Sequence, residues 1–263
     1  MRRRTDIEIE DLGDGITRLN EFDFVNAFLV EGETGAALID AGAGAADLAA
    51  VVKSLTDKPL TVLITHAHAD HVGGAVWFPE VWLHPADLKR GKSYLKPPAR
   101  LYFLWCHKYK KKTHRVSYRA AFQKDYTPRI LELADGQVFD LGGRTLETVL
   151  TPGHSPGSVV FRDSMTGALF TGDNVNPMVT LHFPGGTTVK TWLEGARRTL
   201  ALAGDAKIYG GHGDGRIPQT ALTKAIALAE DVLKDGNGRS HKTRVRRGET
   251  KYPALYYRAD RVE

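Results

Sequence analysis

The sequence predicts an α+β fold in which β-sheets are covered by helices on their outer faces. Short apolar runs rich in β-branched residues, typical of buried strands, come in two groups: one in the first third of the chain and one after residue 140. Helical patterns accompany both groups, and no Pro-, Gly- or Ser-rich linker divides them. We therefore expect a single domain over residues 1–263.

The expected elements follow one another in a regular order. In the first group the apolar runs predict strands at 24–31, 36–40, 61–65 and 81–84, with a helix at 45–55. In the second group they predict strands at 144–150, 158–162, 168–171 and 207–209. Apolar residues at helical spacing then predict helices at 189–203 and 219–234, the second ending near Gly236.

A cluster of imidazoles and one carboxylate follows the third expected strand. The run His66-Ala67-His68-Ala69-Asp70-His71 would be a poor core, since each of its polar side chains would need a buried partner. The same residue types suit zinc, manganese or iron, and one loop can serve two ions. We read the run as a metal site rather than as an incidental polar turn.

Three further segments repeat the arrangement of a strand followed by a ligand type. His154 lies in Thr151-Pro152-Gly153-His154-Ser155-Pro156-Gly157, Asp173 in Thr171-Gly172-Asp173 and His212 in Gly210-Gly211-His212. Glycines permit the sharp turns that gather polar groups at strand ends. Four such segments in one chain predict one shared site.

Together these motifs resemble the metallo-β-lactamase superfamily of metal-dependent hydrolases. The resemblance runs from about Asp40 to His212 and implies an αββα sandwich, with two mixed β-sheets flanked by helices. It implies that one metal is held by His66, His68 and His154, and a second by Asp70, His71 and His212, with Asp173 bridging the two. Asp70 is also expected to be catalytic. Asp40 would orient a ligand histidine, with an alternative role as the cap of the helix that follows.

Seven ligands with one shared carboxylate suit two divalent ions, for which we expect zinc, with manganese or iron as alternatives. A bridging hydroxide would then cleave an ester, lactone or thioester in a small, anionic substrate. Within the resemblance, Asp173 disfavours a true β-lactamase, and His68 disfavours the flavo-di-iron branch. The alternatives left open are a phosphodiesterase or ribonuclease and, less favoured, an iron-dependent dioxygenase.

A basic, aromatic insertion is expected at about 85–127. Residues 89–124 contain twelve Lys and Arg and no Asp or Glu, which leaves 24 basic and 31 acidic residues elsewhere. The insertion could bind an anionic small substrate, a nucleic acid or a membrane surface, or be a solvated helical face whose aromatics pack on the body of the protein or on a second subunit. Nucleic acid is not favoured, and a homodimer stays open. A second, smaller basic stretch lies at 239–251.

The composition is that of an ordinary globular protein, with 42% hydrophobic and 25% charged residues. No apolar run approaches the roughly 20 residues of a membrane span, and no apolar segment typical of a secretory signal follows the basic start. One cysteine, Cys106, excludes an internal disulfide. We expect a cytoplasmic enzyme. His182 could line the site or lie on the surface.

Overall fold

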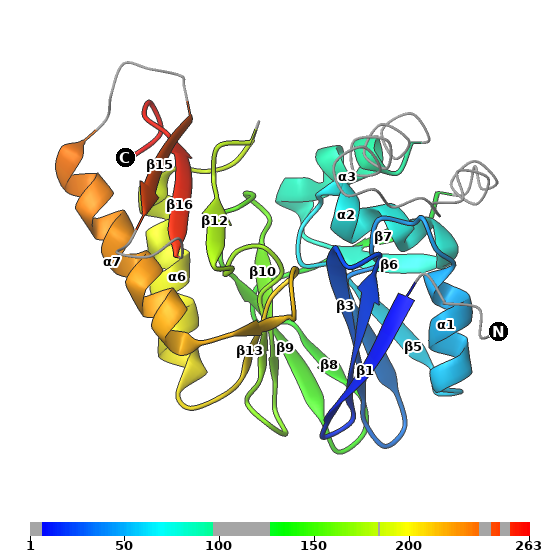
Figure 1. The fold of residues 1–263 in the computed structure, drawn as a ribbon. Helices are drawn as coiled ribbons and strands as arrows, with labels where there is room; N and C mark the ends of the chain where they lie inside the picture. Colours follow the sequence, from blue (N-terminus) through cyan, green and yellow to red (C-terminus); the bar gives the residue numbers. More distant parts are fainter. Residues whose placement is uncertain (1–6, 97–126, 184, 237–242, 248–252) are drawn as a thin grey trace. The chain divides into compact units, whose positions relative to one another are not determined.

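A computed structural model describes residues 7–96, 127–183, 185–236, 243–247 and 253–263 of the chain. Its contacts divide it into two compact units, and element labels follow Figure 1. Unit 1 comprises residues 1–133 and 138–146, and unit 2 comprises residues 134–137 and 147–263. The single domain expected over 1–263 stays a prediction. Most of the expected insertion, residues 97–126, lies outside the described residues.

Unit 1 is built on a sheet of seven strands in sequential order from β1 to β7. The first four strands pair antiparallel and the last three join in parallel, so the sheet is mixed. Its strands are β1 (Ile7–Gly13), β2 (Ile16–Glu21), β3 (Val25–Glu31), β4 (Ala36–Ile39), β5 (Leu60–Leu63), β6 (Glu80–Leu83) and β7 (Arg129–Glu132). Its helices are α1 (Leu48–Leu55), α2 (Ala69–Val72) and α3 (Leu88–Tyr94), with 3₁₀ helices η1 (Gly73–Trp77) and η2 (Pro85–Asp87).

The core of unit 1 forms where α1 and the α2–η1 segment cover the sheet. Leu48 and Val52 from α1 pack in one buried cluster with strand residues such as Leu38 and Val62. Val72 from α2 joins the same cluster. Because α2 begins only six residues after β5, this packing fixes the loop between them, which contains the first expected ligands.

The second sheet has the order β14-β13-β11-β10-β9-β8, and a third sheet has the order β12-β16-β15. The second sheet is also mixed, since β11 and β13 pair in parallel while β10 and β11 pair antiparallel. The strands are β8 (Val138–Asp140), β9 (Thr145–Leu150), β10 (Val159–Asp163), β11 (Leu169–Phe170), β12 (Met178–Thr180), β13 (Ile208–Tyr209), β14 (Arg216–Ile217), β15 (Thr243–Arg247) and β16 (Ala254–Arg258). The helices are α6 (Val189–Ala203) and α7 (Gln219–Asp235).

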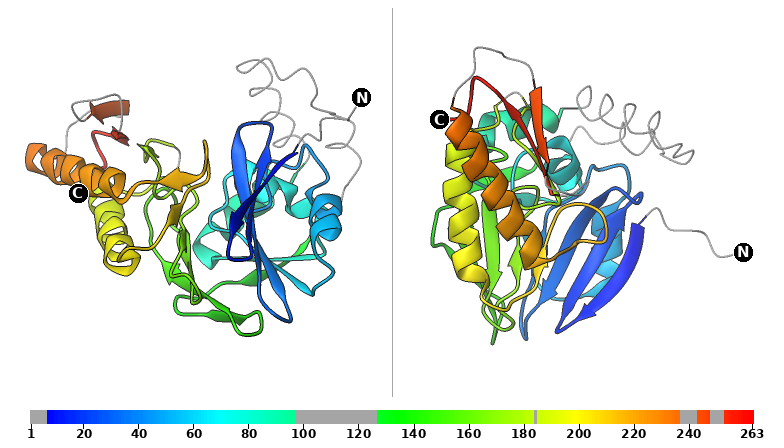
Figure 2. Two further views of the ribbon diagram at one scale, coloured as in Figure 1. Left: turned by 60° about the horizontal axis from the view of Figure 1, so that its bottom comes forward. Right: turned by 60° about the vertical axis from the view of Figure 1, so that its left-hand side comes forward.

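Helices α6 and α7 lie side by side in unit 2, as both views of Figure 2 show. Trp192 and Ala196 of α6 and Ile226 of α7 share one buried cluster with strand residues Val160 and Leu169. The apolar residues at helical spacing therefore pack both helices against the strands, as the sequence predicts. Among the described residues, none of the helices is both long and apolar enough to cross a membrane.

Candidate metal centre

Three histidines and an aspartate of unit 1 form what we call the first donor cluster: His66, His68, Asp70 and His71. They lie in the loop after β5 and in the first turn of α2. His66 is 1% exposed and His71 is fully buried. Burying imidazoles together costs free energy unless each ring nitrogen has a partner. The hydrogen-bond partners of these rings therefore show which ring nitrogens remain available to a ligand.

Asp40, which follows β4, makes hydrogen bonds that orient two of these rings. Its Oδ2 lies 2.8 Å from His71 Nδ1, and its Oδ1 accepts the backbone N–H of Thr65 at 2.8 Å. The Thr65 hydroxyl donates to Asp40 and lies 3.1 Å from His66 Nδ1. Asp40 thus orients His71 directly and His66 through Thr65. It does so from a left-handed backbone, φ 63°, which aspartate tolerates better than most residues.

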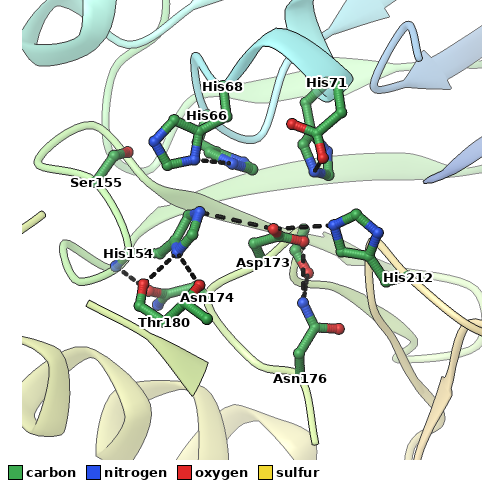
Figure 3. Close-up of polar contacts among 12 residues, drawn as sticks. His66, His68, His71, His154, Ser155, Asp173, Asn174, Asn176, Thr180 and His212 are labelled. Carbon is green, nitrogen blue, oxygen red and sulfur yellow. Dashed lines mark hydrogen bonds and ion pairs between the residues drawn. The ribbon is translucent and has the colours of Figure 1, made fainter. Parts of the chain in front are cut away.

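These contacts assign the hydrogens of two rings. The Thr65 hydrogen goes to Asp40, so its oxygen accepts from His66 Nδ1; the carboxylate of Asp40 accepts from His71 Nδ1. Both rings then keep a lone pair on Nε2. His66 Nε2 lies 3.2 Å from His68 Nδ1, the contact drawn between these rings in Figure 3. His71 Nε2 lies 3.8 Å from the Asp70 carboxylate. Such lone pairs and carboxylates are metal ligands.

Unit 2 carries the second donor cluster: His154, Asp173 and His212. His154 follows β9 in a turn whose backbone is held by hydrogen bonds. Its backbone N–H donates to Asn174 Oδ1 at 2.9 Å, and the indole of Trp192 donates to the Asn174 carbonyl at 2.8 Å. A Cβ on Gly153 would come within 2.4 Å of Asn174 Oδ1 and 2.6 Å of Trp192 Cδ1. Only glycine permits this close approach, so the turn motif fixes the His154 backbone.

The His154 ring is oriented in the same way as the rings of unit 1. Its Nδ1 lies 2.6 Å from the Thr180 carbonyl oxygen, which can only accept, so Nδ1 carries the hydrogen and Nε2 the lone pair. Asp173 lies between the two histidines in Figure 3. Its Oδ2 is 3.6 Å from His154 Nε2 and 3.1 Å from His212 Nε2. The Asn176 amide donates to the other oxygen, Oδ1, at 2.9 Å.

The donor chemistry fits divalent metal ions. In His66, His71 and His154, Nδ1 donates a hydrogen bond to an oxygen and Nε2 keeps its lone pair. This is the usual arrangement of a metal-ligating histidine. The donors of each cluster are His and Asp, the residue types that hold divalent metal ions. Within each cluster, burying lone pairs and carboxylates together without a cation would cost electrostatic free energy.

The chain matches the profile of the Metallo-beta-lactamase superfamily over residues 20–252. It belongs to this superfamily. Among curated relatives, it is 32% identical over 188 residues to "Acyl-coenzyme A thioesterase MBLAC2" of Homo sapiens, which covers 63% of this chain and 65% of that protein. It is 32% identical over 204 residues to "Thioesterase pkgB" of Emericella nidulans, which covers 74% of this chain and 48% of that protein. The chain thus spans less than two thirds of either relative.

Solved structures of the superfamily agree with the fold. TTHA1623 in a di-iron-bound form is 29% identical, with a TM-score of 0.55 over 74% of this chain and 90% of that one. A beta-lactamase domain protein from Burkholderia ambifaria is 21% identical, with a TM-score of 0.62 over 87% of this chain and 74% of that one, and shows the fold alone. The predicted fold class, a metallo-β-lactamase-type αββα sandwich of two mixed sheets flanked by helices, is confirmed.

The structure places the expected ligands in the turns that follow strands or, for Asp70 and His71, in helix α2, and gathers them into the two clusters. The alternative role of Asp40 as a helix cap is wrong, because Asp47 caps α1. Sequence reasoning missed the side chains that orient the ligands: Thr65, Asn174, Asn176 and Thr180. For Asn174 a signal existed, since it directly follows the Asp173 motif.

His182 is partly buried two residues beyond Thr180, and its ring centroid lies 4.2 Å from that of Phe183. Burial, and then the charge of His154, lower the pKa of His182 below its ordinary value. It therefore packs among aromatic side chains rather than lying free on the surface.

In the second basic stretch, β15 (Thr243–Arg247) pairs with β16, and residues 237–242 and 248–252 lie outside the described part.

Proposed function

We propose that this chain is a metal-dependent hydrolase that cleaves thioesters of small acyl groups. In the proposed centre, His66, His68 and His154 would hold one ion, Asp70, His71 and His212 would hold the other, and Asp173 would contribute to both. Zinc is our expected metal. The observation that carries the proposal is the orientation of three buried histidines by oxygen partners on Nδ1, which prepares Nε2 for metal.

When bound, the ions would supply an activated water and would polarise the carbonyl oxygen under attack. The residues of the chain do the rest. Asp40 and Thr180 keep the ligand rings in place, and Asn176 holds one oxygen of Asp173 so that the other faces His154 and His212. The carboxylate of Asp70 is the proton acceptor that we assign to the attacking water, in line with its expected catalytic role.

The thioester is favoured over a lactone or a simple ester by the relatives. Two proteins 32% identical to this chain, from a mammal and a fungus, carry thioesterase in their names. The di-iron form of TTHA1623 keeps iron open as the metal. No observation among the described residues favours the phosphodiesterase, and the cytoplasmic location and the homodimer stay predictions.

The test is hydrolysis by zinc-, iron- and manganese-loaded protein, with metal content measured on the same samples. Acyl thioesters, an aryl ester, a lactone and a bis-aryl phosphodiester are compared at equal concentration. We expect the thioester to have the highest kcat/KM. Asp173→Ala should abolish turnover and reduce metal content, whereas Asp214→Asn, at an exposed aspartate two residues beyond His212, should change neither. Preference for the phosphodiester, or full activity of Asp173→Ala, would refute the proposal.

A further inference from the structure

Two exposed apolar side chains of unit 2 flank Thr180, the residue that orients the ring of His154. Among the described residues, six large apolar side chains are exposed, and two of them, Met178 at 44% and Phe183 at 41%, lie within three residues of Thr180. The Thr180 carbonyl oxygen accepts from His154 Nδ1 at 2.6 Å (Figure 3). The ring of Phe183 stands edge-on to the His154 ring, with 6.2 Å between their centroids. Apolar surface therefore meets water directly beside an expected metal ligand.

The third sheet places Met178 on the face that carries Thr180. The two residues are two positions apart on β12, so their side chains point to the same side of the sheet. Tyr256 of β16 pairs with Thr180 in register and shares this face. Val179, between them, points to the opposite side and is fully buried in the core of unit 2. One face of the sheet thus packs on the core, and the other borders His154.

The loop after β12 presents Phe183 together with a second ring. His182 packs against Phe183, with 4.2 Å between ring centroids, and its ring lies 6.0 Å from that of Tyr256. The N–H of Leu181 donates to the Tyr256 carbonyl at 2.7 Å, which ties the start of the loop to β16. The aromatic face of the sheet therefore continues from Tyr256 through His182 to Phe183.

The other end of the loop is tied to the turn that carries His154. Thr187 donates twice to the Gly153 carbonyl, from its N–H at 3.1 Å and from its hydroxyl at 2.7 Å. Gly153 directly precedes His154. The N–H of Gly186 donates to the Phe183 carbonyl at 2.9 Å and closes the loop on itself. The backbone of Phe183 is thus fixed relative to His154, so its ring is a built part of the surface beside this ligand.

The ligand that these side chains suit is apolar. A thioether and a phenyl ring offer dispersion and hydrophobic contact but no ionic partner. An aliphatic chain that leaves water against them gains about 4-fold in affinity for each methylene buried, the equivalent of about 0.8 kcal/mol. In a thioester such a chain is bonded to the acyl carbon, the atom that would be attacked beside His154. A pantetheine-type thiol instead carries amides, which need hydrogen-bond partners that a thioether and a phenyl ring do not supply.

We propose that Met178 and Phe183 bind the acyl chain of the thioester, and that the enzyme prefers unbranched apolar acyl groups of several carbons over acetyl. We call these two side chains the acyl surface. The inference rests on the proposed function, which puts the bond to be cleaved beside His154. Met178 and Phe183 set specificity and do not take part in bond cleavage.

The experiment compares Phe183→Ser and Met178→Ser with a matched control, Met165→Ser, at an apolar side chain of the same unit that is 57% exposed between β10 and β11. Acetyl, butyryl and octanoyl N-acetylcysteamine share one neutral thiol and differ only in chain length. We expect kcat/KM of the unaltered protein to rise at least 10-fold from acetyl to octanoyl. Phe183→Ser should remove most of this rise while the acetyl value stays within 2-fold, and Phe183→Leu should recover part of it. Met178→Ser should remove a smaller part, and Met165→Ser none.

Binding of the product acids tests the acyl surface without turnover. Octanoate and acetate share a carboxylate, so their difference in affinity reports on the chain alone. Calorimetry on zinc-loaded protein should find octanoate at least 10-fold tighter than acetate, and this ratio should fall at least 5-fold in Phe183→Ser at equal zinc content. If no thioester is cleaved but octanoate still binds through Phe183, the proposed function fails and the acyl surface stands.

Three results would overturn the inference. A chain-length preference that Phe183→Ser leaves unchanged would mean that the acyl chain lies elsewhere, while the proposed function would stand. Equal losses for all three thioesters would put the thiol part against Phe183. A dimer in light scattering that dissociates in Phe183→Ser would mean that a second copy of the chain covers these side chains.

Discussion

Glu21, the last residue of β2, supports the clearest prediction about stability. Its side chain is 4% exposed and accepts the backbone N–H groups of Ala43, Ala45 and Ala46 at 2.5, 2.9 and 2.8 Å. These residues form the loop that follows Asp40. Burial raises the pKa of Glu21 from 4.5 to about 7, although the hydrogen bonds from the loop act in the opposite direction.

A raised pKa makes the folded state bind the proton more tightly than the unfolded state does. Glu21 therefore contributes stability that is fully present below about pH 4.5 and is lost as the pH rises through about 7. A shift from 4.5 to about 7 corresponds to ~3 kcal/mol at 1.36 kcal/mol per pH unit. Between pH 5 and pH 8 we expect the unaltered protein to lose about 2 to 3 kcal/mol relative to Glu21→Gln, whose amide does not titrate.

The assay is urea unfolding of both proteins at several pH values, with a chelator present so that metal binding contributes no pH dependence of its own. Histidines titrate in the same window, but they are common to both proteins and cancel in the difference. A difference in unfolding free energy that does not change from pH 5 to pH 8 would refute the reasoning. A difference of opposite slope would mean that the three N–H groups outweigh burial and lower the pKa.

Three more predictions concern the residues behind the ligands. Asp40→Asn removes the charge that orients His71 and should weaken zinc binding about 10- to 100-fold in a chelator competition, with an unchanged circular dichroism spectrum; unchanged affinity would exclude this role. Trp192→Phe leaves the Asn174 carbonyl without its buried donor and should cost about 1–3 kcal/mol in urea unfolding, and a cost near zero would contradict this. Gly153→Ala overlaps Asn174 and Trp192, so it should destabilise by about 1–3 kcal/mol and lower zinc content, whereas wild-type stability would contradict the close packing.

The sequence predicts the elements well where burial alone decides them. The helix expected at 189–203 is α6 with the same bounds, because its apolar residues repeat at helical spacing and pack on one core. The expected strands do not include β1 and β2, although β2 is largely buried, nor do they include β7, β8, β12, β14, β15 and β16. β12 and β14 are two or three residues long, too short for a pattern of alternating exposure to stand out.

Three of the differences at element ends have identifiable local causes. The expected strand 61–65 ends at Leu63, since the N–H of Thr65 binds the Asp40 carboxylate. The expected strand 36–40 ends at Ile39, because Asp40 adopts a left-handed backbone. The helix expected from residue 45 begins at Leu48 with Asp47 as its cap, and the N–H groups of Ala45 and Ala46 donate to Glu21 instead. Local propensity cannot show these partners, which are distant in sequence.

Partners of this kind also explain why a ligand motif alone does not make a metal site. The motif residues supply imidazole nitrogens, but either nitrogen of a neutral imidazole can carry the hydrogen. Asp40, Thr65 and Thr180 remove this freedom for three rings by accepting at Nδ1 before any metal arrives. The ordering cost is thus met in folding rather than in metal binding, which raises affinity. Replacing such a partner should therefore lower affinity while every ligand stays in the sequence.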